Sequence, residues 1–414
     1  MYLIYNIISI IFLITSPLIV IYRILKGKED KKRFFERYAI SSEKKLKGKL
    51  VWFHCSSVGE LLSIIPLIEK LELNSKINQI LITTTTLSSS KIFTKFKFKK
   101  TIHQFFPIDN NLIINKFLNY WKPSCLLLCE SEIWPNLIHN IDRKKIKLIL
   151  LNARLTKKSF GKWRKIKKFS SNLFGKFDKC LVQNLETEGR LKILGANKIK
   201  NLGNLKFSTS KRIKTDLLDK KSLNFFKDKK ILITAASTHF NEEEFVIKNH
   251  LYFQKNYKNI ISIVVPRHVE RTEEICQELE KFSLKFHKHS SLKKINKKTD
   301  IYIVDTYGEL NKFYKISNIV FMGGSLIKHG GQNPLEPAKH GCKIIHGPYV
   351  GNFTEIYTKL SKMKISTKFN TYKKGIKIID NEFQKKKSTF DNKKIINYGQ
   401  RILNLTYNEI LKFI

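Results

Sequence analysis

The 414-residue sequence has little cysteine, glycine or proline, with six, 18 and nine of each. The six cysteines form no Cys-x-x-Cys pair, which excludes a disulfide-stapled small scaffold and predicts a reducing compartment. The histidines show no zinc-like spacing, so no structural metal is expected. Apolar residues make up 42% of the chain, enough to bury a core, and the length predicts more than one domain.

Acidic residues are also scarce: 34 Asp and Glu stand against 78 Lys and Arg, which gives a formal net charge of +44. An excess of this size is typical of a protein that binds a polyanion, an anionic membrane or an acidic substrate. Lysine, however, outnumbers arginine by 67 to 11, which together with the scarcity of glycine and proline is typical of an AT-rich genome. Part of the charge is therefore compositional, and charge alone identifies no partner.

Residues 2–22 carry no charged side chain. As a helix they would span about 31 Å, the thickness of the hydrocarbon core of a bilayer. The stretch lacks the basic start and the small-residue cleavage site of a signal peptide. By the positive-inside rule, the basic cluster that follows predicts a cytoplasmic location for this end; it comprises Arg23, Lys26, Lys28, Lys31, Lys32 and Arg33. We predict a single-pass transmembrane anchor over residues 2–22. A buried or surface-lying helix is the alternative, because polar or helix-breaking residues weaken the span: Asn6, Thr15, Ser16 and Pro17.

Short apolar runs alternate with helical patterns along the rest of the chain, in two series. The first series has strand-like runs at 50–55, 80–86, 125–129, 147–151, 180–183 and 199–203. After a basic stretch near 210–229, the second series has runs at 231–235, 260–265, 301–304, 319–322 and 343–345. This alternation predicts an α/β protein of two doubly wound, Rossmann-like domains facing a cleft. We expect the domains over residues 34–210 and 229–390, followed by a C-terminal helix over 391–414. Ligands of such sheets bind at the carboxyl ends of the strands.

In the first series, charged candidates follow the strand-like runs. Glu60 lies in HCSSVGE, where it either complements a helix start or acts as a general base. Glu130 and Glu132 lie in CESEIWPN, where they either shift each other's pKa or serve as ordinary helix-terminal acids. Lys206 follows the last run in GNLKF, and in so lysine-rich a chain a surface role is its alternative.

In the second series, seven of the 18 glycines and three of the nine prolines lie between residues 323 and 351. Within this region Asn333, Pro334 and Glu336 predict a helix N-terminus whose free N–H groups bind phosphate. Arg267 ends another run, and its guanidinium also suits a phosphate. Neither a P-loop nor a dinucleotide fingerprint is present. The pattern predicts a nucleotide held mainly by the second domain, with an acceptor and a base on the first.

The ordered set of motifs resembles the bacterial 3-deoxy-D-manno-octulosonic acid (Kdo) transferase family. This family has the two-domain GT-B plan and adds Kdo from CMP-Kdo to the lipid A precursor. The matching segments follow the family's order over about residues 50–360 and include HCSSVGE, FPID, ESEIWPN, LNARLTKKSF, GNLKF, DTYGEL, FMGGS and GGQNPLEPA. Two departures are visible: Gln332 stands where the family usually has His, and Tyr307 where Met is common.

The resemblance implies that Glu60 is the base that deprotonates the acceptor hydroxyl, and that Glu130 and Lys206 stabilise the transition state. It also implies a CMP site made of Pro266, Arg267, Tyr307, Gly308, Glu309, Asn333, Pro334, Leu335 and Glu336. The implied reaction is an inverting transfer without metal or cofactor, at the cytoplasmic side of the inner membrane, in lipopolysaccharide core biosynthesis. The implied partners are CMP-Kdo, the lipid A precursor (lipid IVA) and the anionic membrane surface, with no nucleic acid.

Two alternatives remain at this point. One is another GT-B transferase that uses a UDP-sugar. The other is a basic membrane-peripheral or nucleic-acid-binding protein with inactive transferase-like domains. This last alternative predicts loss of the charged motif residues, yet the sequence retains Glu60, Lys206, Arg267 and Glu336.

Overall fold

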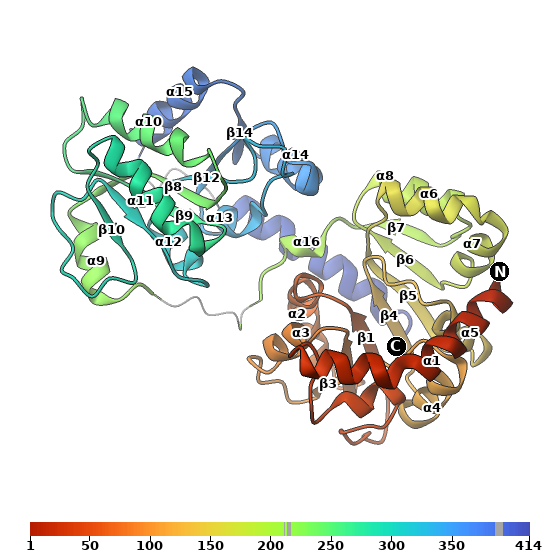
Figure 1. Cartoon of the computed structure of the whole chain (residues 1–414). Coiled ribbons are helices and arrows are strands. Elements are labelled where there is room, and N and C mark those ends of the chain that lie inside the picture. The colour runs from red at the N-terminus through yellow and green to blue at the C-terminus, as the bar shows by residue number, and fades with distance from the viewer. Residues whose placement is uncertain (211, 213–216, 386–391) are drawn as a thin grey trace. The chain divides into compact units, whose positions relative to one another are not determined.

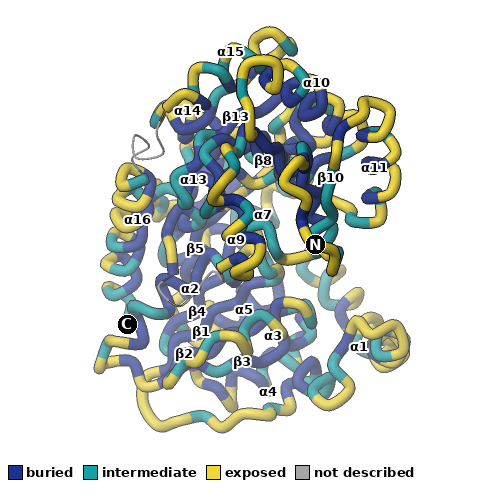
Figure 2. The backbone as a smooth tube through the Cα atoms, turned by 90° about the vertical axis from the view of Figure 1, so that its left-hand side faces the viewer, coloured by how far each residue is buried: buried dark blue, intermediate teal, exposed yellow. Residues whose placement is uncertain are grey.

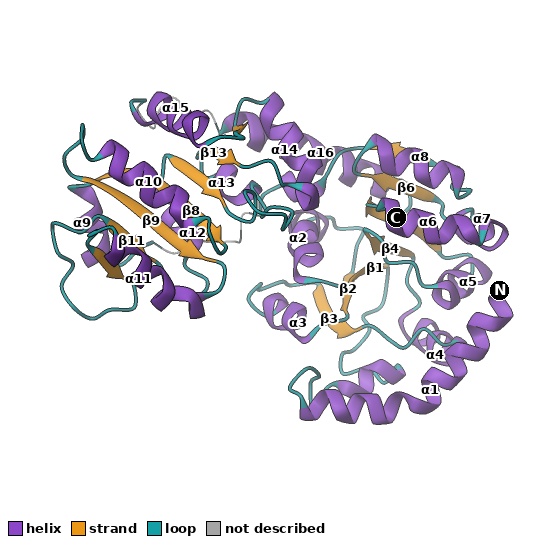
Figure 3. Cartoon of the chain, turned by 45° about the horizontal axis from the view of Figure 1, so that its top comes forward, coloured by secondary structure: helices purple, strands orange, loops and turns teal. Residues whose placement is uncertain are grey.

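The computed structural model describes residues 1–210, 212, 217–385 and 392–414, and the chain divides into two compact units. The N-terminal unit comprises Met1–Arg212 and Asn397–Ile414, and the C-terminal unit comprises Ile213–Ile396. Each unit holds one seven-stranded parallel sheet flanked by helices (Figure 1, Figure 3). The predicted α/β class with two doubly wound parallel sheets is confirmed.

The sheet of the N-terminal unit runs in the order β3-β2-β1-β4-β5-β6-β7. Its strands are β1 Leu50–Cys55, β2 Gln79–Thr84, β3 Thr101–Phe105, β4 Cys125–Cys129, β5 Lys147–Ala153, β6 Lys179–Val182 and β7 Ile199–Asn201. Every residue of β1, β2 and β4 is buried, as expected when helices cover both faces of a parallel sheet. The helices between the strands are α2 Val58–Glu72, α3 Leu87–Phe93, α4 Asn111–Trp121, α5 Pro135–Arg143, α6 Lys157–Lys165, α7 Lys167–Phe174 and α8 Leu185–Ile193.

The sheet of the C-terminal unit runs in the order β10-β11-β9-β8-β12-β13-β14. Its strands are β8 Lys230–Thr238, β9 Ile260–Pro266, β10 Phe286–Lys288, β11 Ile301–Ile303, β12 Ile319–Met322, β13 Lys343–His346 and β14 Ser366–Lys368. Its helices are α9 Lys220–Lys227, α10 Glu243–Phe253, α11 Thr272–Lys281, α12 Leu310–Ile316, α13 Leu335–Lys339, α14 Thr354–Lys362 and α15 Tyr372–Phe383. Figure 2 shows the central strands as buried and the outer helices as partly exposed.

Three strands lie outside the predicted runs: β3, β10 and β14. Each is an edge strand, and their sequences TIHQF, FHK and STK mix polar with apolar residues, so no apolar run marks them. The basic break predicted near 210–229 contains α9, whose Phe226 is buried. Residues 211 and 213–216 of this break lie outside the described residues. Residues 386–391, where the predicted boundary between the second domain and the C-terminal helix falls, also lie outside them.

The last helix, α16 (Lys393–Leu411), belongs to the N-terminal unit from Asn397 onwards. Gly399 lies so close to η2 (Leu205–Phe207) that an added Cβ would sit 2.3 Å from the Phe207 carbonyl oxygen. Further along α16, Lys200 pairs with Glu409 at 2.7 Å. The close glycine contact and this ion pair fix the end of the chain beside the strand β7.

The first helix, α1, spans Tyr2–Leu25. Its mean hydropathy reaches 2.3 over an 18-residue window, and 17% of that window is buried. Within the described parts of the chain it is the one helix long and apolar enough to cross a membrane.

Candidate active site

Polar side chains follow several neighbouring strands of the N-terminal unit. Because parallel strands end at the same edge of a sheet, the residues after β1, β4 and β7 converge there. Glu60 follows β1, Glu130 and Glu132 follow β4, and Lys206 follows β7.

The carboxylate of Glu60 is fixed by the turn that starts α2. Ser57 is the N-cap, and its Oγ accepts from the Glu60 N–H at 3.3 Å and donates to Glu60 Oε1 at 2.9 Å. The N–H of Ser56 donates to Glu60 Oε2 at 2.8 Å. Burial raises the pKa of Glu60 to about 7, and the nearby carboxylates of Glu132 and Glu130 also raise it. The hydrogen bonds from Ser56 and Ser57 lower this pKa, but by less than burial raises it. Glu60 therefore both closes a capping turn and titrates near neutral pH.

Glu130 and Lys206 form an ion pair, with 2.6 Å between Lys206 Nζ and Glu130 Oε1. Glu130 has a φ of 51° and is 9% exposed. Its N–H donates to the carbonyl of Leu151 at 2.9 Å, which ties the turn after β4 to β5. Positive φ is uncommon outside glycine, and such backbone strain concentrates at functional sites.

A relay of buried amides at the ends of β5, β6 and β7 positions Lys206. Asn204 Oδ1 accepts from the Lys206 N–H at 2.9 Å, and Asn204 Nδ2 donates to Gln183 Oε1 at 2.9 Å. Gln183 Nε2 donates in turn to the carbonyl of Asn152 at 2.8 Å. Asn152 Oδ1 accepts from the Leu205 N–H at 2.9 Å. The sequence does not predict this relay, and its one signal is an amide side chain at or directly after the end of each of the three apolar runs.

Glu132 has different partners from Glu130. Its Oε2 lies 3.1 Å from His54 Nε2 and accepts from Trp134 Nε1 at 2.9 Å. His54 is fully buried, and its Nδ1 lies 3.1 Å from the carbonyl oxygen of Thr83. Glu130 and Glu132, which are neighbours in the sequence, thus have different partners: Lys206 binds Glu130, whereas His54 and Trp134 contact Glu132.

The residues of the predicted CMP site all lie in the C-terminal unit. Pro266 ends β9, and the N–H of the exposed Arg267 donates to the Thr238 carbonyl at 2.9 Å. Tyr307 is 62% exposed, and its hydroxyl donates to Glu270 Oε1 at 3.1 Å.

The two residues after Tyr307 complete the turn between β11 and α12. Gly308 has a φ of 87°, a conformation that favours glycine. Glu309 pairs with Lys312 at 2.6 Å.

The helix start predicted to bind phosphate needs a correction. α13 begins at Leu335 and has five residues, and Pro334 is its N-cap rather than its first helical residue. Asn333 Oδ1 accepts from the Leu335 N–H at 3.2 Å. The Asn333 side chain therefore takes one of the N–H groups that the sequence predicts to be free, while Glu336 lies exposed on the first turn.

The glycine-rich loop after β12 is held by a buried carboxylate. Glu242 Oε2 accepts from the Gly324 N–H at 2.6 Å, and Oε1 accepts from the N–H groups of Ser325 at 3.0 Å and Leu326 at 2.9 Å. Glu242 is fully buried. The N–H groups of Gly324, Ser325 and Leu326 are therefore already bound by an internal carboxylate. In the sequence Glu242 is the first of three consecutive glutamates, and no local pattern marks it as a partner of this loop.

Three histidines gather beside the same loop and were also missed. The ring centroid of His239 lies 4.1 Å from that of His329 and 6.1 Å from that of His268. Burial, and to a lesser extent the charges of its neighbours His329 and His268, lowers the pKa of His239 to about 4. Gln332 Nε2 lies 3.2 Å from His239 Nε2. The amide that replaces the family's histidine therefore still makes a polar contact here.

The two parallel-sheet α/β units place the chain in the GT-B structural class. A solved UDP-GlcNAc 2-epimerase from Neisseria meningitidis, bound to UDP-GlcNAc, aligns with a TM-score of 0.55 at 12% identity. The alignment covers 88% of this chain and 99% of the epimerase. The glycosyltransferase of kitacinnamycin aligns with a TM-score of 0.53 at 9% identity, over 88% of this chain and 99% of its own. At these identities the shared property is the fold.

Sequence similarity identifies the family within this class. Residues 32–209 match the protein-family model described as 3-deoxy-D-manno-octulosonic-acid transferase (kdotransferase). The chain is 32% identical over 418 residues to the 3-deoxy-D-manno-octulosonic acid transferase of Rickettsia bellii, covering 99% of both chains. It is 32% identical over 362 residues to that of Haemophilus influenzae, covering 86% of this chain and 84% of the relative. The chain belongs to the Kdo transferase family, and it is a glycosyltransferase.

Proposed function

We propose that the chain transfers Kdo from CMP-Kdo to the lipid A precursor, with inversion at the anomeric carbon and without metal or cofactor. Family membership supports the sugar that is transferred. The observation that carries the mechanism is the Glu60 carboxyl, whose pKa is raised to about 7. It lies at the same sheet edge as the Glu130–Lys206 ion pair.

Glu60 takes the proton of the attacking acceptor hydroxyl. A general base works best with a pKa near the operating pH, since it is then deprotonated in a useful fraction and still basic. The donors at Ser56 and Ser57 fix both carboxylate oxygens, so the base is oriented before the acceptor binds. An inverting transfer needs this one base and no covalent intermediate.

Glu130 and Lys206 stabilise charge as the bond to CMP breaks. The sugar acquires oxocarbenium character, which a nearby carboxylate such as Glu130 stabilises. Kdo carries its own carboxylate beside the anomeric carbon, and the Lys206 ammonium is the complementary charge. The fixed ion pair supplies both signs without reorganisation at the moment of reaction.

The C-terminal unit binds the donor nucleotide. The Arg267 guanidinium, exposed after β9, is suited to a bidentate grip on the CMP phosphate as it departs. The remaining contacts come from Pro266, Tyr307, Gly308, Glu309, Asn333, Pro334, Leu335 and Glu336. Glu242 already binds three N–H groups of the glycine-rich loop. The phosphate charge is therefore stabilised mainly by side chains and less by the N–H groups of this loop.

The acceptor is a lipid, and α1 holds the chain at the membrane that contains it. We place the enzyme at the cytoplasmic face of the inner membrane. Lys26, Lys28 and Lys31 are exposed directly after α1, where acidic head groups attract basic residues.

A transfer assay tests this proposal. The full-length chain, in liposomes, is given CMP-Kdo and a tetra-acylated disaccharide bisphosphate, with and without EDTA. We expect Kdo transfer in both conditions. No turnover by folded protein would contradict the proposed function, and loss of turnover in EDTA alone would contradict only the metal-independent mechanism. Calorimetry with CMP and UDP then separates the donors: tighter binding of UDP would favour the UDP-sugar alternative.

A further inference from the structure

Polar side chains recur along one face of α1 and bind side chains of the N-terminal unit. The Tyr5 hydroxyl donates to Asp109 Oδ2 at 2.7 Å. Ser9 Oγ accepts from Asn110 Nδ2 and from Asn136 Nδ2, each at 3.2 Å. Ser9 and Asp109 are each 7% exposed. This part of α1 is therefore packed on the loop before α4 and the start of α5.

The contacts continue along the whole helix. Near its start, Asn6 Oδ1 accepts from Asn111 Nδ2 at 3.0 Å. Near its middle, Ser16 Oγ lies 3.1 Å from the Tyr38 hydroxyl, and Ser16 is buried. Ser9, Ser16 and Arg23 follow one another at intervals of seven residues, which is about two turns of an α-helix. The contacting residues therefore lie on one face of α1.

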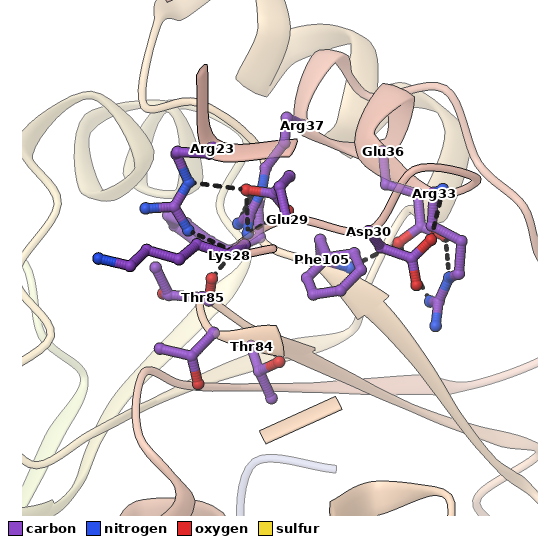
Figure 4. Close-up of polar contacts among 12 residues, drawn as sticks. Arg23, Lys28, Glu29, Asp30, Arg33, Glu36, Arg37, Thr84, Thr85 and Phe105 are labelled. Carbon is purple, nitrogen blue, oxygen red and sulfur yellow. Dashed lines mark hydrogen bonds and ion pairs between the residues drawn. The ribbon is translucent and has the colours of Figure 1, made fainter. Parts of the chain in front are cut away.

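The carboxyl end of α1 is held by a buried ion network (Figure 4). Arg23 Nε donates to Glu29 Oε2 at 3.0 Å, and Arg37 pairs with Glu29 Oε1 at 3.1 Å. Arg37 also donates to the carbonyl oxygens of Thr85 at 2.6 Å and Phe106 at 3.1 Å. Both ends and the middle of α1 are thus fixed to the same unit, and the helix lies lengthwise along it (Figure 1).

The opposite face of α1 is apolar and has no protein covering it among the described residues. Thirteen large hydrophobic side chains of the helix are exposed: Leu3, Ile4, Ile7, Ile8, Ile10, Ile11, Phe12, Ile14, Leu18, Ile19, Ile21, Tyr22 and Leu25. The one polar side chain on this face between them, Thr15, donates to the carbonyl of Ile11 at 3.1 Å. A contiguous apolar surface of this kind marks a site of interaction.

Lengthwise docking is incompatible with crossing a bilayer in the docked state. If the docked α1 crossed the hydrocarbon core, the elements it packs on would enter the core with it. These carry exposed charges, among them Lys116 on α4 and Arg143 and Lys144 at the end of α5. Charged groups at that depth are rare and strongly unfavourable unless they line a polar interior.

We propose that α1 is an in-plane membrane helix: its isoleucine- and leucine-rich face inserts into one leaflet of an anionic phospholipid bilayer while its polar face stays bound to the N-terminal unit. The exposed Lys26, Lys28, Lys31 and Lys32 then meet the acidic head groups of the same leaflet. Met1 stays on the same side of the membrane as the N-terminal unit. This replaces the predicted single-pass span with the surface-lying alternative, and it does not depend on the reaction that the enzyme catalyses.

Spin-label depth measurements test the proposal. The six native cysteines are all buried, so a single introduced cysteine can be labelled selectively. Leu3→Cys, Ile14→Cys and Leu25→Cys, each at a position more than 70% exposed, sample the two ends and the middle of α1. In vesicles with acidic lipid, an in-plane helix gives similar, shallow depths at all three positions. A label at position 14 that is much deeper than those at positions 3 and 25 would overturn the proposal.

A topology measurement in spheroplasts adds an independent readout. A cysteine in a short neutral extension before Met1 is compared with Lys28→Cys by labelling with a membrane-impermeant maleimide. We expect both to be labelled only after permeabilisation. Labelling of the N-terminal cysteine in intact spheroplasts, with Lys28→Cys protected, would show a crossing helix and overturn the proposal.

A matched pair of variants tests whether the docking contacts set this orientation. Tyr5→Phe with Ser9→Ala removes the contacts to Asp109, Asn110 and Asn136, while Thr15→Ala removes a hydroxyl bonded within α1. We expect unequal label depths in the docking variant and unchanged, equal depths in Thr15→Ala. Equal depths in both variants would show that docking does not set the orientation, which would contradict the argument.

Discussion

The substitution Glu242→Gln tests whether the Glu242 carboxylate holds the glycine-rich loop. Glu242 receives four backbone hydrogen bonds, two on each oxygen: Oε2 accepts from His239 and Gly324, and Oε1 from Ser325 and Leu326. Glutamine keeps the shape of the side chain but places an NH₂ group where one oxygen stands. Whichever oxygen the NH₂ group replaces, two backbone N–H donors, at least one of them in the loop, then face another donor.

The size of the effect follows from that count. A buried donor left without an acceptor costs about 1–3 kcal/mol, so two cost about 2–6 kcal/mol. The loop can relax in part, and we expect about 2–4 kcal/mol. If the loop opens locally, this corresponds to amide exchange that is about 30- to 1,000-fold faster.

Hydrogen exchange resolved to single residues is the suitable assay, because it reports the loop itself. All four tryptophans, at 52, 121, 134 and 163, lie in the N-terminal unit, so fluorescence would report the other unit. Glu244→Gln is the control: Glu244 is exposed and pairs only at the surface with Lys248, so we expect no change at the loop. Exchange of the amides at 324–326 within threefold of wild type in Glu242→Gln would refute the reasoning.

Three further predictions concern the N-terminal site. Lys206→Met leaves the buried Glu130 without its cation, and we expect the free energy of unfolding to fall by about 1–3 kcal/mol. This is less than the loss of a fully buried pair would cause, because 24% of the Lys206 side chain is exposed. Glu130→Gln combined with Lys206→Met should recover stability in denaturant titrations without recovering activity; equal recovery of both would contradict the proposed roles. Glu132→Gln removes a negative charge that raises the pKa of Glu60, so the acidic limb of the pH–rate profile should move to lower pH. Ser57→Ala removes a hydrogen bond that lowers this pKa, so the limb should move to higher pH, and shifts in the same direction for both variants would contradict the assignment.

The strands that carry the site could be predicted because each is a buried apolar run. Glu130 and Lys206, which follow such runs, form an ion pair although 76 positions separate them in the sequence, since parallel strands end at one edge. Edge strands β3, β10 and β14 could not be predicted in this way, because the half-exposed edge of a sheet tolerates polar residues.

The contacts of Glu242 and of α1 could not be predicted from the sequence, for a different reason. Glu242 binds amides 82 to 84 positions later in the chain, and no local pattern encodes such a pairing. On α1, residues such as Asn6 and Ser16 look like weak points in a membrane span. Only their partners Asn111 and Tyr38 reveal them as part of a docking face.

The central claim is that Glu60 is the base for Kdo transfer, and its pH dependence tests this claim most directly. A base acts in its deprotonated form, so kcat/KM of the wild-type chain with CMP-Kdo and acceptor should rise with pH through an apparent pKa near 7, the value to which burial raises this carboxyl. Glu60→Gln should lower kcat/KM by about 10²–10⁴-fold and abolish that limb. A Glu60→Gln variant that keeps near-wild-type turnover with the same limb would contradict the account.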